Sequence, residues 1–400
     1  MKIAILADNI FSNGGAGIIA LNHAKAMKDL GFEVIIITTS QDIGEKHEEY
    51  NIKTYNIFSK YPPILRAYKS LNNISVVKEV GVILNKERPD IVHAHNIHYH
   101  ISYRSLVEAK KYSKAVFLTI HDSMSFHYSK LFPEAVYTEN EIVKSYKVSP
   151  WEQLKLFKWQ YNPFRNLIIK KYLKIPDKIF AVSDALKQAL QDNDISNVEV
   201  IHNGIDVGKW IMENKNEDNR KYIFWGGRLS RAKGGDVLIK SFIELVKREP
   251  NAMLLVVGKR DSYVMEIENK VKNIGIENNV IFTGSKTQDE MKSLYAKSTL
   301  VVVPSLCFDW FPTVILESMA SGKPVIATCW GGAREMIIDG KTGFIINPKN
   351  EKEFTERILL FLMNKEKVEE MGKNSFERVK NLFSLDEHIK ILIEQYDKFL

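Results

Sequence analysis

The sequence of 400 residues lacks most features of secreted, membrane-spanning and metal-binding proteins. Its only cysteines, Cys307 and Cys329, have the spacing of neither a metal site nor a redox motif, which favours a reducing compartment. No apolar run approaches the roughly 18 residues of a membrane-spanning helix. The first apolar run, 3–7, is too short for the core of a signal peptide and ends at Asp8. These absences predict a soluble, cytoplasmic protein.

The composition also lacks any bias toward disordered or fibrous structure. Hydrophobic residues make up 45% of the chain and charged residues 26%, which is typical of globular proteins. At about 150 residues per domain, the length predicts two or three domains, each with a sizeable core.

The excess of positive charge is concentrated in one segment, 144–174. The whole chain has 56 lysines and arginines against 49 aspartates and glutamates. Within the segment Glu152 is the only acidic residue, and the basic residues are Lys144, Lys147, Lys155, Lys158, Arg165, Lys170, Lys171 and Lys174. Aromatic and leucine side chains, including Trp151 and Trp159, are interspersed with them. This mixture favours an anionic membrane surface or a lipid-linked acidic ligand. A helical cover with solvated lysines is the alternative.

Short apolar runs alternate with helix-length amphipathic stretches along the rest of the chain. Such alternation predicts parallel, doubly wound sheets. The strands expected in the first half are 2–7, 33–39, 91–93, 116–120, 178–182 and 198–201. Those expected in the second half are 222–225, 252–257, 280–283, 300–303, 324–327 and 343–346.

A polar stretch at 213–220 separates the two halves and is typical of a linker. We therefore predict an α/β protein with two Rossmann-like domains, 1–212 and 221–385, facing a central cleft. The amphipathic stretch 386–400 follows no strand, and we expect it to pack back on the first domain. Ligands of open α/β sheets bind beyond the carboxyl ends of the strands, so functional residues are sought there.

The loop after the first strand contains glycines and opens a helix. Gly15, Gly17 and Ala20 match the spacing of a dinucleotide fingerprint, but too many residues separate them from the strand. The second strand ends in Thr38, Thr39 and Ser40, with no carboxylate placed to hold a ribose. The backbone N–H groups of Gly14 and Gly15 still suit a phosphate, and a structural tight turn is the alternative.

Histidines gather around the fourth and fifth strands. They are His93, His95, His98, His100 and His121. His93 and His95 share one face of a strand without a defined third ligand, so no metal site is predicted. His121 and Asp122 end a strand and are candidates for a polar contact with a ligand. We expect the carboxylate to fix the tautomer of the imidazole and to raise its pKa.

The second half carries a basic loop with glycines directly after its first strand. Gly226, Gly227 and Arg228 end the strand, and Lys233 precedes the next helix. A guanidinium and an ammonium beside glycines suit a diphosphate and offset the charge that develops on a phosphate leaving group. A basic surface turn is the alternative.

Two carboxylates flank the start of a later helix. Pro312 near the helix start places Asp309 in the preceding loop and Glu317 within the helix. Carboxylates accept paired hydrogen bonds from the vicinal hydroxyls of sugars and ribose. The acid–base pair of a hydrolase is the competing interpretation.

Together these motifs resemble the family 4 glycosyltransferases, which are retaining enzymes with the GT-B fold. The resemblance covers essentially the whole chain, and the order and spacing of the motifs are jointly specific. It rests on Gly14–Gly15, His121–Asp122, 200–206 (VIHNGID), Gly226–Arg228 with Lys233, and Asp309 to Glu317 followed by 318–327 (SMASGKPVIA).

The resemblance implies a nucleotide-sugar donor on the domain at 221–385 and an acceptor on the domain at 1–212. The donor-binding residues would be Gly14, Gly15, Asn203, Gly227, Arg228, Lys233, Asp309 and Glu317. The catalytic residues would be His121, Arg228, Lys233 and Asp309. The candidates on the acceptor side are Asn96, His98 and Asp122. Asp309 stands where the family usually has Glu, which leaves the identity of the donor sugar open.

We expect transfer of a hexose from a nucleotide-diphosphate donor to a saccharide or lipid-linked saccharide, as in surface polysaccharide or glycolipid synthesis. Retention by front-side attack is favoured because no residue is an obvious covalent nucleophile. No metal or other cofactor and no nucleic acid partner are expected, and segment 144–174 favours the inner face of a membrane. A nucleotide-sugar epimerase and a non-catalytic sugar-binding protein are the alternatives. The geometry of the first loop argues against a nicotinamide oxidoreductase.

Overall fold

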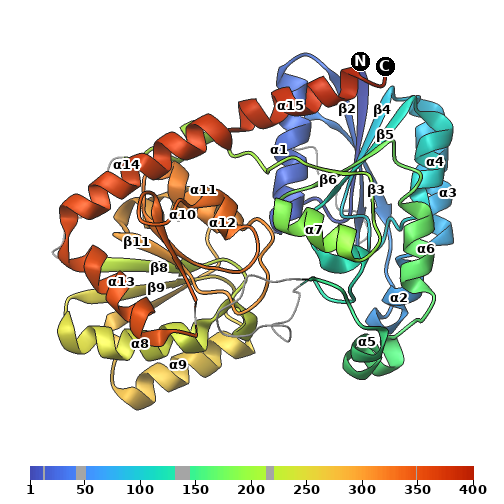
Figure 1. The fold of residues 1–400 in the computed structure, drawn as a ribbon. Helices are drawn as coiled ribbons and strands as arrows, with labels where there is room; N and C mark the ends of the chain where they lie inside the picture. Colours follow the sequence, from blue (N-terminus) through green and yellow to red (C-terminus); the bar gives the residue numbers. More distant parts are fainter. Residues whose placement is uncertain (12–13, 42–50, 131–144, 213–219, 348) are drawn as a thin grey trace. The chain divides into compact units, whose positions relative to one another are not determined.

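The computed structural model describes residues 1–11, 14–41, 51–130, 145–212, 220–347 and 349–400. The chain forms two compact units (Figure 1). Unit 1 contains the described residues of 1–204 together with Leu385–Leu400, and unit 2 contains the described residues of 205–384. Each unit is a parallel sheet with helices on its faces, which confirms the predicted α/β class.

Unit 1 is built on a sheet whose described strands run in the order β3-β2-β1-β4-β5-β6-β7. Neighbouring strands are parallel throughout. The strands are β1 (Lys2–Ala7), β2 (Glu33–Ser40), β3 (Lys53–Phe58), β4 (Ile91–His95), β5 (Ala115–Ile120), β6 (Lys178–Ala181) and β7 (Val198–Val200). Most are continuous apolar runs because both faces of a parallel sheet are covered.

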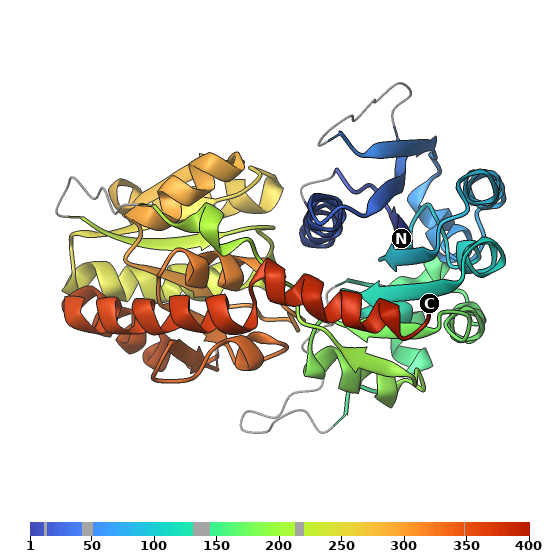
Figure 2. The same cartoon turned by 90° about the horizontal axis from the view of Figure 1, so that it is seen from above.

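The helices of unit 1 lie on both faces of this sheet. They are α1 (Gly15–Asp29), α2 (Arg66–Lys69), α3 (Ile74–Glu87), α4 (Ser105–Tyr112), α5 (Pro150–Phe157), α6 (Arg165–Tyr172), α7 (Asp184–Asp192) and α15 (Leu385–Asp397). Figure 1 shows α1 and α15 on one side of the sheet and α3, α4 and α6 on the other. Ile389, Leu392 and Tyr396 of α15 are buried in the same cluster as Ile3 and Ile5 of β1. The two chain ends lie near each other in both views (Figure 2).

Unit 2 contains a second parallel sheet with the order β10-β9-β8-β11-β12-β13 among its described strands. They are β8 (Lys221–Gly226), β9 (Ala252–Val257), β10 (Val280–Gly284), β11 (Leu300–Val303), β12 (Val325–Thr328) and β13 (Gly343–Ile346). The helices are α8 (Gly235–Arg248), α9 (Ser262–Ile274), α10 (Gln288–Lys297), α11 (Thr313–Ala320), α12 (Ala333–Met336), α13 (Glu351–Met363) and α14 (Lys365–Leu382).

The division between the units falls at residue 204, before the predicted linker, since the Ile205 amide donates to the carbonyl of Phe383 at 2.9 Å. The predicted linker itself, 213–220, lies outside the described residues except for Arg220. Within the described ranges, no helix has both the length and the apolar character needed to cross a bilayer.

Candidate functional site

The loops after β8 and β11 meet where the strand order of unit 2 reverses. β8 lies between β9 and β11, so successive connections leave it in opposite directions. Ligands of open α/β sheets bind at such reversal points. The predicted diphosphate residues follow β8 and Asp309 follows β11. The fold thus joins residues that the sequence separates by 76 positions.

Two glycines allow other loops to approach the loop after β11 closely: Gly234 in the loop after β8 and Gly331 in the loop after β12. Gly234 has a φ of +76°, and a Cβ there would lie 1.9 Å from the carbonyl oxygen of Pro304. A Cβ on Gly331 would lie 2.2 Å from the carbonyl oxygen of Asp309. Between the loops after β11 and β8, the amide of Leu306 also donates to the carbonyl of Ala232 at 2.8 Å. Side chains at either glycine would push the loops apart.

An ion pair between Lys233 and Asp309 lies at the centre of this arrangement. The Lys233 ammonium donates to Oδ2 of Asp309, and the side chains are 18% and 20% exposed. Burial alone would lower the pKa of Lys233, but the negative charge of Asp309 outweighs it and the pKa is raised. The residue predicted at the diphosphate is therefore charged and bonded to the one predicted at the donor sugar.

Arg228 supplies a second cation to the same loop. It is exposed, and its charge opposes the influence of Asp309 on the pKa of Lys233, so the two cations lie within electrostatic reach. Gly227 before it has a φ of +107°. The next helix, α8, starts without a side-chain cap on Gly234, which leaves N–H groups of its first turn for an anion. These features suit phosphate oxygens.

Glu317 lies on α11 and is fixed by a tyrosine from α10. Its Oε2 accepts a hydrogen bond from the Tyr295 hydroxyl at 2.7 Å. The Tyr295 ring is buried and stacks on Phe224 with a centroid distance of 4.3 Å. Burial raises the pKa of Glu317, and the hydrogen bonds from Tyr295 and Thr313 act in the opposite direction. Sequence reasoning missed Tyr295, whose role follows only from the packing.

In unit 1, Asp8 anchors the loop at the reversal point between β1 and β4. Its carboxylate accepts the amide N–H groups of Tyr99, His100 and Ile101 at 2.6, 2.9 and 2.7 Å. Burial raises the pKa of Asp8 to about 6, although these bonds favour the charged form. Asp8 is not among the residues predicted from the sequence, although its position directly after the first strand is a signal that points to it.

Gly14, Gly15 and Asn203 also belong to unit 1. Gly14 is the N-cap of α1 and gives no side-chain cap, so the first N–H groups of the helix suit an anion as expected. Asn203 is 4% exposed, and its Oδ1 has no hydrogen-bond donor among the described residues. A buried polar atom of this kind is uncommon in native proteins and suits a ligand group. Their donor-binding roles stay predictions.

The predicted contact between the side chains of His121 and Asp122 does not form. Oδ2 of Asp122 accepts from Asn96 Nδ2 at 3.0 Å and lies 3.5 Å from His98 Nε2. His121 instead contacts His95 Nδ1 through Nε2 at 3.0 Å. Burial is the main reason that the pKa of His121 falls to about 3, so the expectation of a raised pKa is wrong. Consecutive side chains after a strand point in different directions, which separates the two groups.

Two of the acceptor-side candidates, Asn96 and Asp122, are hydrogen-bonded to each other, whereas Nε2 of His98 lies near the Asp122 carboxylate but has no hydrogen-bond partner among the described residues. Asn96 has a φ of +45°, and its Oδ1 accepts the backbone N–H of His121 at 3.0 Å. His98 and Asp122 are buried. These contacts fix the path of the two loops after β4 and β5. Recognition of an acceptor by these three residues stays a prediction.

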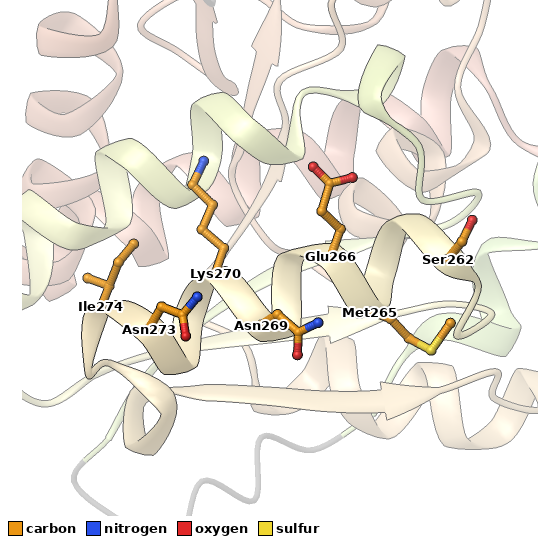
Figure 3. A pocket seen from close by; sticks show the side chains of 7 residues that line it. All are labelled: Ser262, Met265, Glu266, Asn269, Lys270, Asn273 and Ile274. Carbon is orange, nitrogen blue, oxygen red and sulfur yellow. The ribbon is translucent and has the colours of Figure 1, made fainter.

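A shallow hollow in unit 2 lies away from the predicted residues. It is lined by side chains of a single helix, α9, as Figure 3 shows. Glu266 and Lys270 in this hollow bind Arg231 and Asp236 respectively. No predicted site residue lines it, so the hollow is separate from the predicted donor site.

Comparisons with known proteins identify the family and the fold of the chain. The family model "Glycosyltransferase Family 4" matches residues 13–209, and "Glycosyl transferases group 1" matches 206–378. An uncharacterised glycosyltransferase of Methanocaldococcus jannaschii is 27% identical over 368 residues, which cover 91% of this chain and 89% of that protein.

Two solved structures share the fold over their whole length. Sucrose-phosphate synthase of Thermosynechococcus elongatus has a TM-score of 0.78 at 18% identity, and the match covers 100% of this chain and 98% of the synthase chain. HepE of Anabaena, in complex with UDP, has a TM-score of 0.75 at 18% identity, with 100% of both chains covered. The two family models together span residues 13–378 and overlap at 206–209, and the chain therefore belongs to the family 4 glycosyltransferases of the GT-B fold.

Proposed function

We propose that the protein transfers a hexose from a nucleotide-diphosphate donor to a saccharide or lipid-linked saccharide, with retention at the anomeric carbon. The observation that carries this proposal is the Lys233–Asp309 pair, with Arg228 in reach, at the reversal point of the unit 2 sheet. HepE, which shares the fold, was solved with UDP and with UDP-glucose, which supports a donor of this class.

The proposed roles follow from the charges. Phosphate oxygens of the donor would take the place of Asp309 on Lys233 and bind Arg228, since both cations favour a multiply charged anion. Glu317, held by Tyr295, would accept the ribose hydroxyls. As the bond from the anomeric carbon to the phosphate oxygen breaks, the two cations would stabilise the charge left on the phosphate.

Retention would follow from attack on the face that the phosphate leaves. The acceptor oxygen bonds to the anomeric carbon, and its proton passes to a departing phosphate oxygen. Positioning of donor and acceptor would supply most of the rate enhancement. The cations perform the charge neutralisation for which other transferases use a metal, so we expect transfer to proceed in the presence of EDTA.

A panel of nucleotide-sugars tests the proposal by thermal shift and by product analysis. A donor that binds the native state raises the melting temperature. We expect Arg228→Ala and Lys233→Ala to lose both the shift and the transfer. Arg231→Ala is the matched control, because Arg231 is exposed on the same loop but binds Asp236 and Glu266. Unchanged transfer in both site variants would contradict the assignment, and epimerised free donor without transfer would favour the epimerase.

We also propose that unit 1 binds an anionic membrane surface through α5, α6 and the turns beside them. In α5, Gln153 is the only buried residue. Trp151 is 71% exposed and Trp159 is 89% exposed, which is uncommon for tryptophan. Further exposed apolar side chains are Ile64, Leu65, Tyr68, Leu154, Leu156, Phe164 and Leu167. Figure 1 places α2, α5 and α6 at the same end of the unit.

Not every cation of segment 144–174 supports this surface. Arg165 is 1% exposed, and its guanidinium donates to the carbonyl of Met124 at 2.5 Å, so it is structural. Lys170 pairs with Asp194 at 2.8 Å, and Lys144 lies outside the described residues. The exposed lysines that remain in the segment are Lys147, Lys155, Lys158, Lys171 and Lys174, and Lys155, Lys158 and Lys171 are close in sequence to aromatic residues of α5, α6 and the turn after α5. Aromatic rings at the interface and lysines toward anionic headgroups are the usual pattern of membrane-surface helices.

Sedimentation with vesicles of anionic lipid tests this surface. We expect the triple variant Lys155→Gln, Lys158→Gln and Lys171→Gln to bind less, and wild-type binding to weaken as salt rises. The control removes the same charge from unit 2, with Lys259, Lys272 and Lys373 changed to Gln. Equal loss in both triple variants would indicate only a general charge effect.

A further inference from the structure

An unbroken chain of hydrogen-bonding groups runs into the interior of unit 1 from His121. The successive contacts are His121 Nε2 to His95 Nδ1 at 3.0 Å, His95 Nε2 to His23 Nδ1 at 3.2 Å, His23 Nε2 to the Tyr396 hydroxyl at 3.3 Å, that hydroxyl to His93 Nδ1 at 2.5 Å, and His93 Nε2 to Thr119 Oγ1 at 2.7 Å. We call this series the histidine chain. It joins α1, β4, β5 and α15.

The imidazoles of the chain are neutral because they are buried. His23 and His93 are 0% exposed and His95 is 2% exposed. Burial, together with the neighbouring imidazoles, holds the pKa of each well below its ordinary value. A neutral imidazole has one N–H donor and one bare nitrogen acceptor. Each contact in the chain therefore needs a donor on one side and an acceptor on the other, and choosing one tautomer determines all the others.

Thr119 determines the direction of the chain. Its hydroxyl hydrogen has His93 Nε2 as its one acceptor among the residues that the structure describes. If His93 donated instead, the buried hydroxyl hydrogen would have no acceptor, which is unfavourable. Thr119 therefore donates to His93, and His93 Nδ1–H donates to the oxygen of Tyr396. Tyr396 then donates to His23 Nε2.

The same logic reaches the end of the chain. His23 Nδ1–H donates to His95 Nε2, and His95 Nδ1–H donates to His121 Nε2. Because Nε2 of His121 is then the acceptor, its hydrogen must be on Nδ1. That nitrogen has no partner among the described residues, and His121 is partly exposed.

We propose that Thr119, His93, Tyr396, His23 and His95 are positioning residues that hold His121 as a neutral Nδ1–H donor for a ligand oxygen. The nature of the ligand, an oxygen of the sugar donor, rests on the proposed function. The tautomer itself does not. Tyr396, in helix α15, thus helps to determine which ring nitrogen of His121 carries the hydrogen.

A metal ion would use the same histidines differently. Ring nitrogens of His23, His93 and His95 lie within 4.8 Å of one another, which is compatible with a three-histidine site. In the histidine chain, however, every nitrogen of these residues already has a partner. Bound metal would take the lone pairs that accept these hydrogen bonds, so the two arrangements exclude each other.

Nitrogen-15 NMR of the protein labelled at histidine reads the tautomers directly. We expect His121 as Nδ1–H in the wild type without added ligand. Thr119→Val and Tyr396→Phe remove the directing groups, and His121 should then exchange between both tautomers. Thr119→Ser keeps the hydroxyl and should restore Nδ1–H. Tyr128→Phe is the control, because it removes another buried tyrosine hydroxyl of unit 1, whose hydrogen bonds within the described part of the chain are to the Asn162 backbone.

The transfer rate gives the second measurement. If only the Nδ1–H form is competent, the rate falls in proportion to the lost population of that form, roughly twofold to tenfold in Thr119→Val and Tyr396→Phe. A wild-type His121 with its hydrogen on Nε2 would overturn the proposal, as would spectra of His23 and His95 that change on treatment with EDTA. Failure of sugar transfer in every variant, with the predicted tautomers present, would contradict the proposed function alone.

Discussion

Asp309→Asn should tighten the binding of a nucleoside diphosphate while impairing sugar transfer. In the structure the carboxylate of Asp309 forms an ion pair with Lys233, which is one of the two cations proposed to bind the phosphates. A diphosphate must displace that carboxylate before it binds Lys233. Removing the negative charge frees the ammonium, and it removes a repulsion from the phosphate.

The size of the effect follows from the exposure of the pair. Two unit charges about 4 Å apart interact by about 1 kcal/mol in water and about 4 kcal/mol at an effective dielectric constant of 20. Side chains that are 18% and 20% exposed lie between these limits. Because asparagine still accepts a hydrogen bond from Lys233, we expect a net gain of about 1.4 kcal/mol, or about tenfold in Kd.

Isothermal titration with UDP, ADP and GDP measures the effect in four proteins: the wild type, Asp309→Asn, Lys233→Ala and the double variant. Lys233→Ala should weaken binding by about tenfold to a hundredfold. The tightening by Asp309→Asn should be smaller in the Lys233→Ala background, because only the direct repulsion remains. Both effects should shrink in high salt.

Equal tightening in both backgrounds would show that Asp309 does not act through Lys233. Weaker binding in Asp309→Asn would refute the reasoning altogether, since the carboxylate would then help to hold the diphosphate. Melting temperatures without nucleotide supply the control for folding. We expect a modest decrease in Asp309→Asn, because Lys233 loses its charged partner.

Three further predictions concern stability. Gly234→Ala should destabilise unit 2 by about 3 kcal/mol or more in chemical denaturation, because the methyl group would meet the carbonyl oxygen of Pro304 at 1.9 Å. Glu87 is bonded to Lys2 and Lys53, and its pKa is lowered to about 2. Its contribution to the free energy of unfolding, up to about 2 kcal/mol, should be present above pH 4.5 and lost as the pH falls toward 2. Glu87→Gln should lose this part of the acid sensitivity, and a variant as acid-sensitive as the wild type would contradict the prediction. The raised pKa of Asp8 has the opposite effect on the pH dependence of stability. Wild-type stability should fall as the pH rises from about 4 to about 6, and Asp8→Asn should remove this dependence.

The sequence allowed the architecture to be predicted because buried parallel strands are continuous apolar runs. The expected runs 252–257, 300–303 and 343–346 coincide with β9, β11 and β13. β3 was missed because its sequence, KTYNIF, is largely polar and the strand lies at the edge of the sheet, where one side needs no apolar cover. Family membership was likewise predicted correctly, since it rests on several motifs in a fixed order.

The site was predicted in its parts but not in its contacts. Strand ends locate Lys233 and Asp309 individually, yet their pairing depends on how closely two loops approach. The side-chain contacts of Asp122 were assigned to its sequence neighbour His121, whereas the carboxylate faces Asn96. Such pairings follow from side-chain direction and from packing between distant elements, neither of which spacing along the chain records.

The return of α15 to unit 1 has a consequence for how this protein is made. The segment Leu385–Leu400 completes a hydrophobic cluster that includes Ile3 and Ile5, some 380 positions earlier in the chain. Unit 2 is already translated when residues 385–400 leave the ribosome. Most of unit 1 is therefore synthesised before unit 2 but completed only after it, and until then the apolar side chains that α15 covers stay exposed.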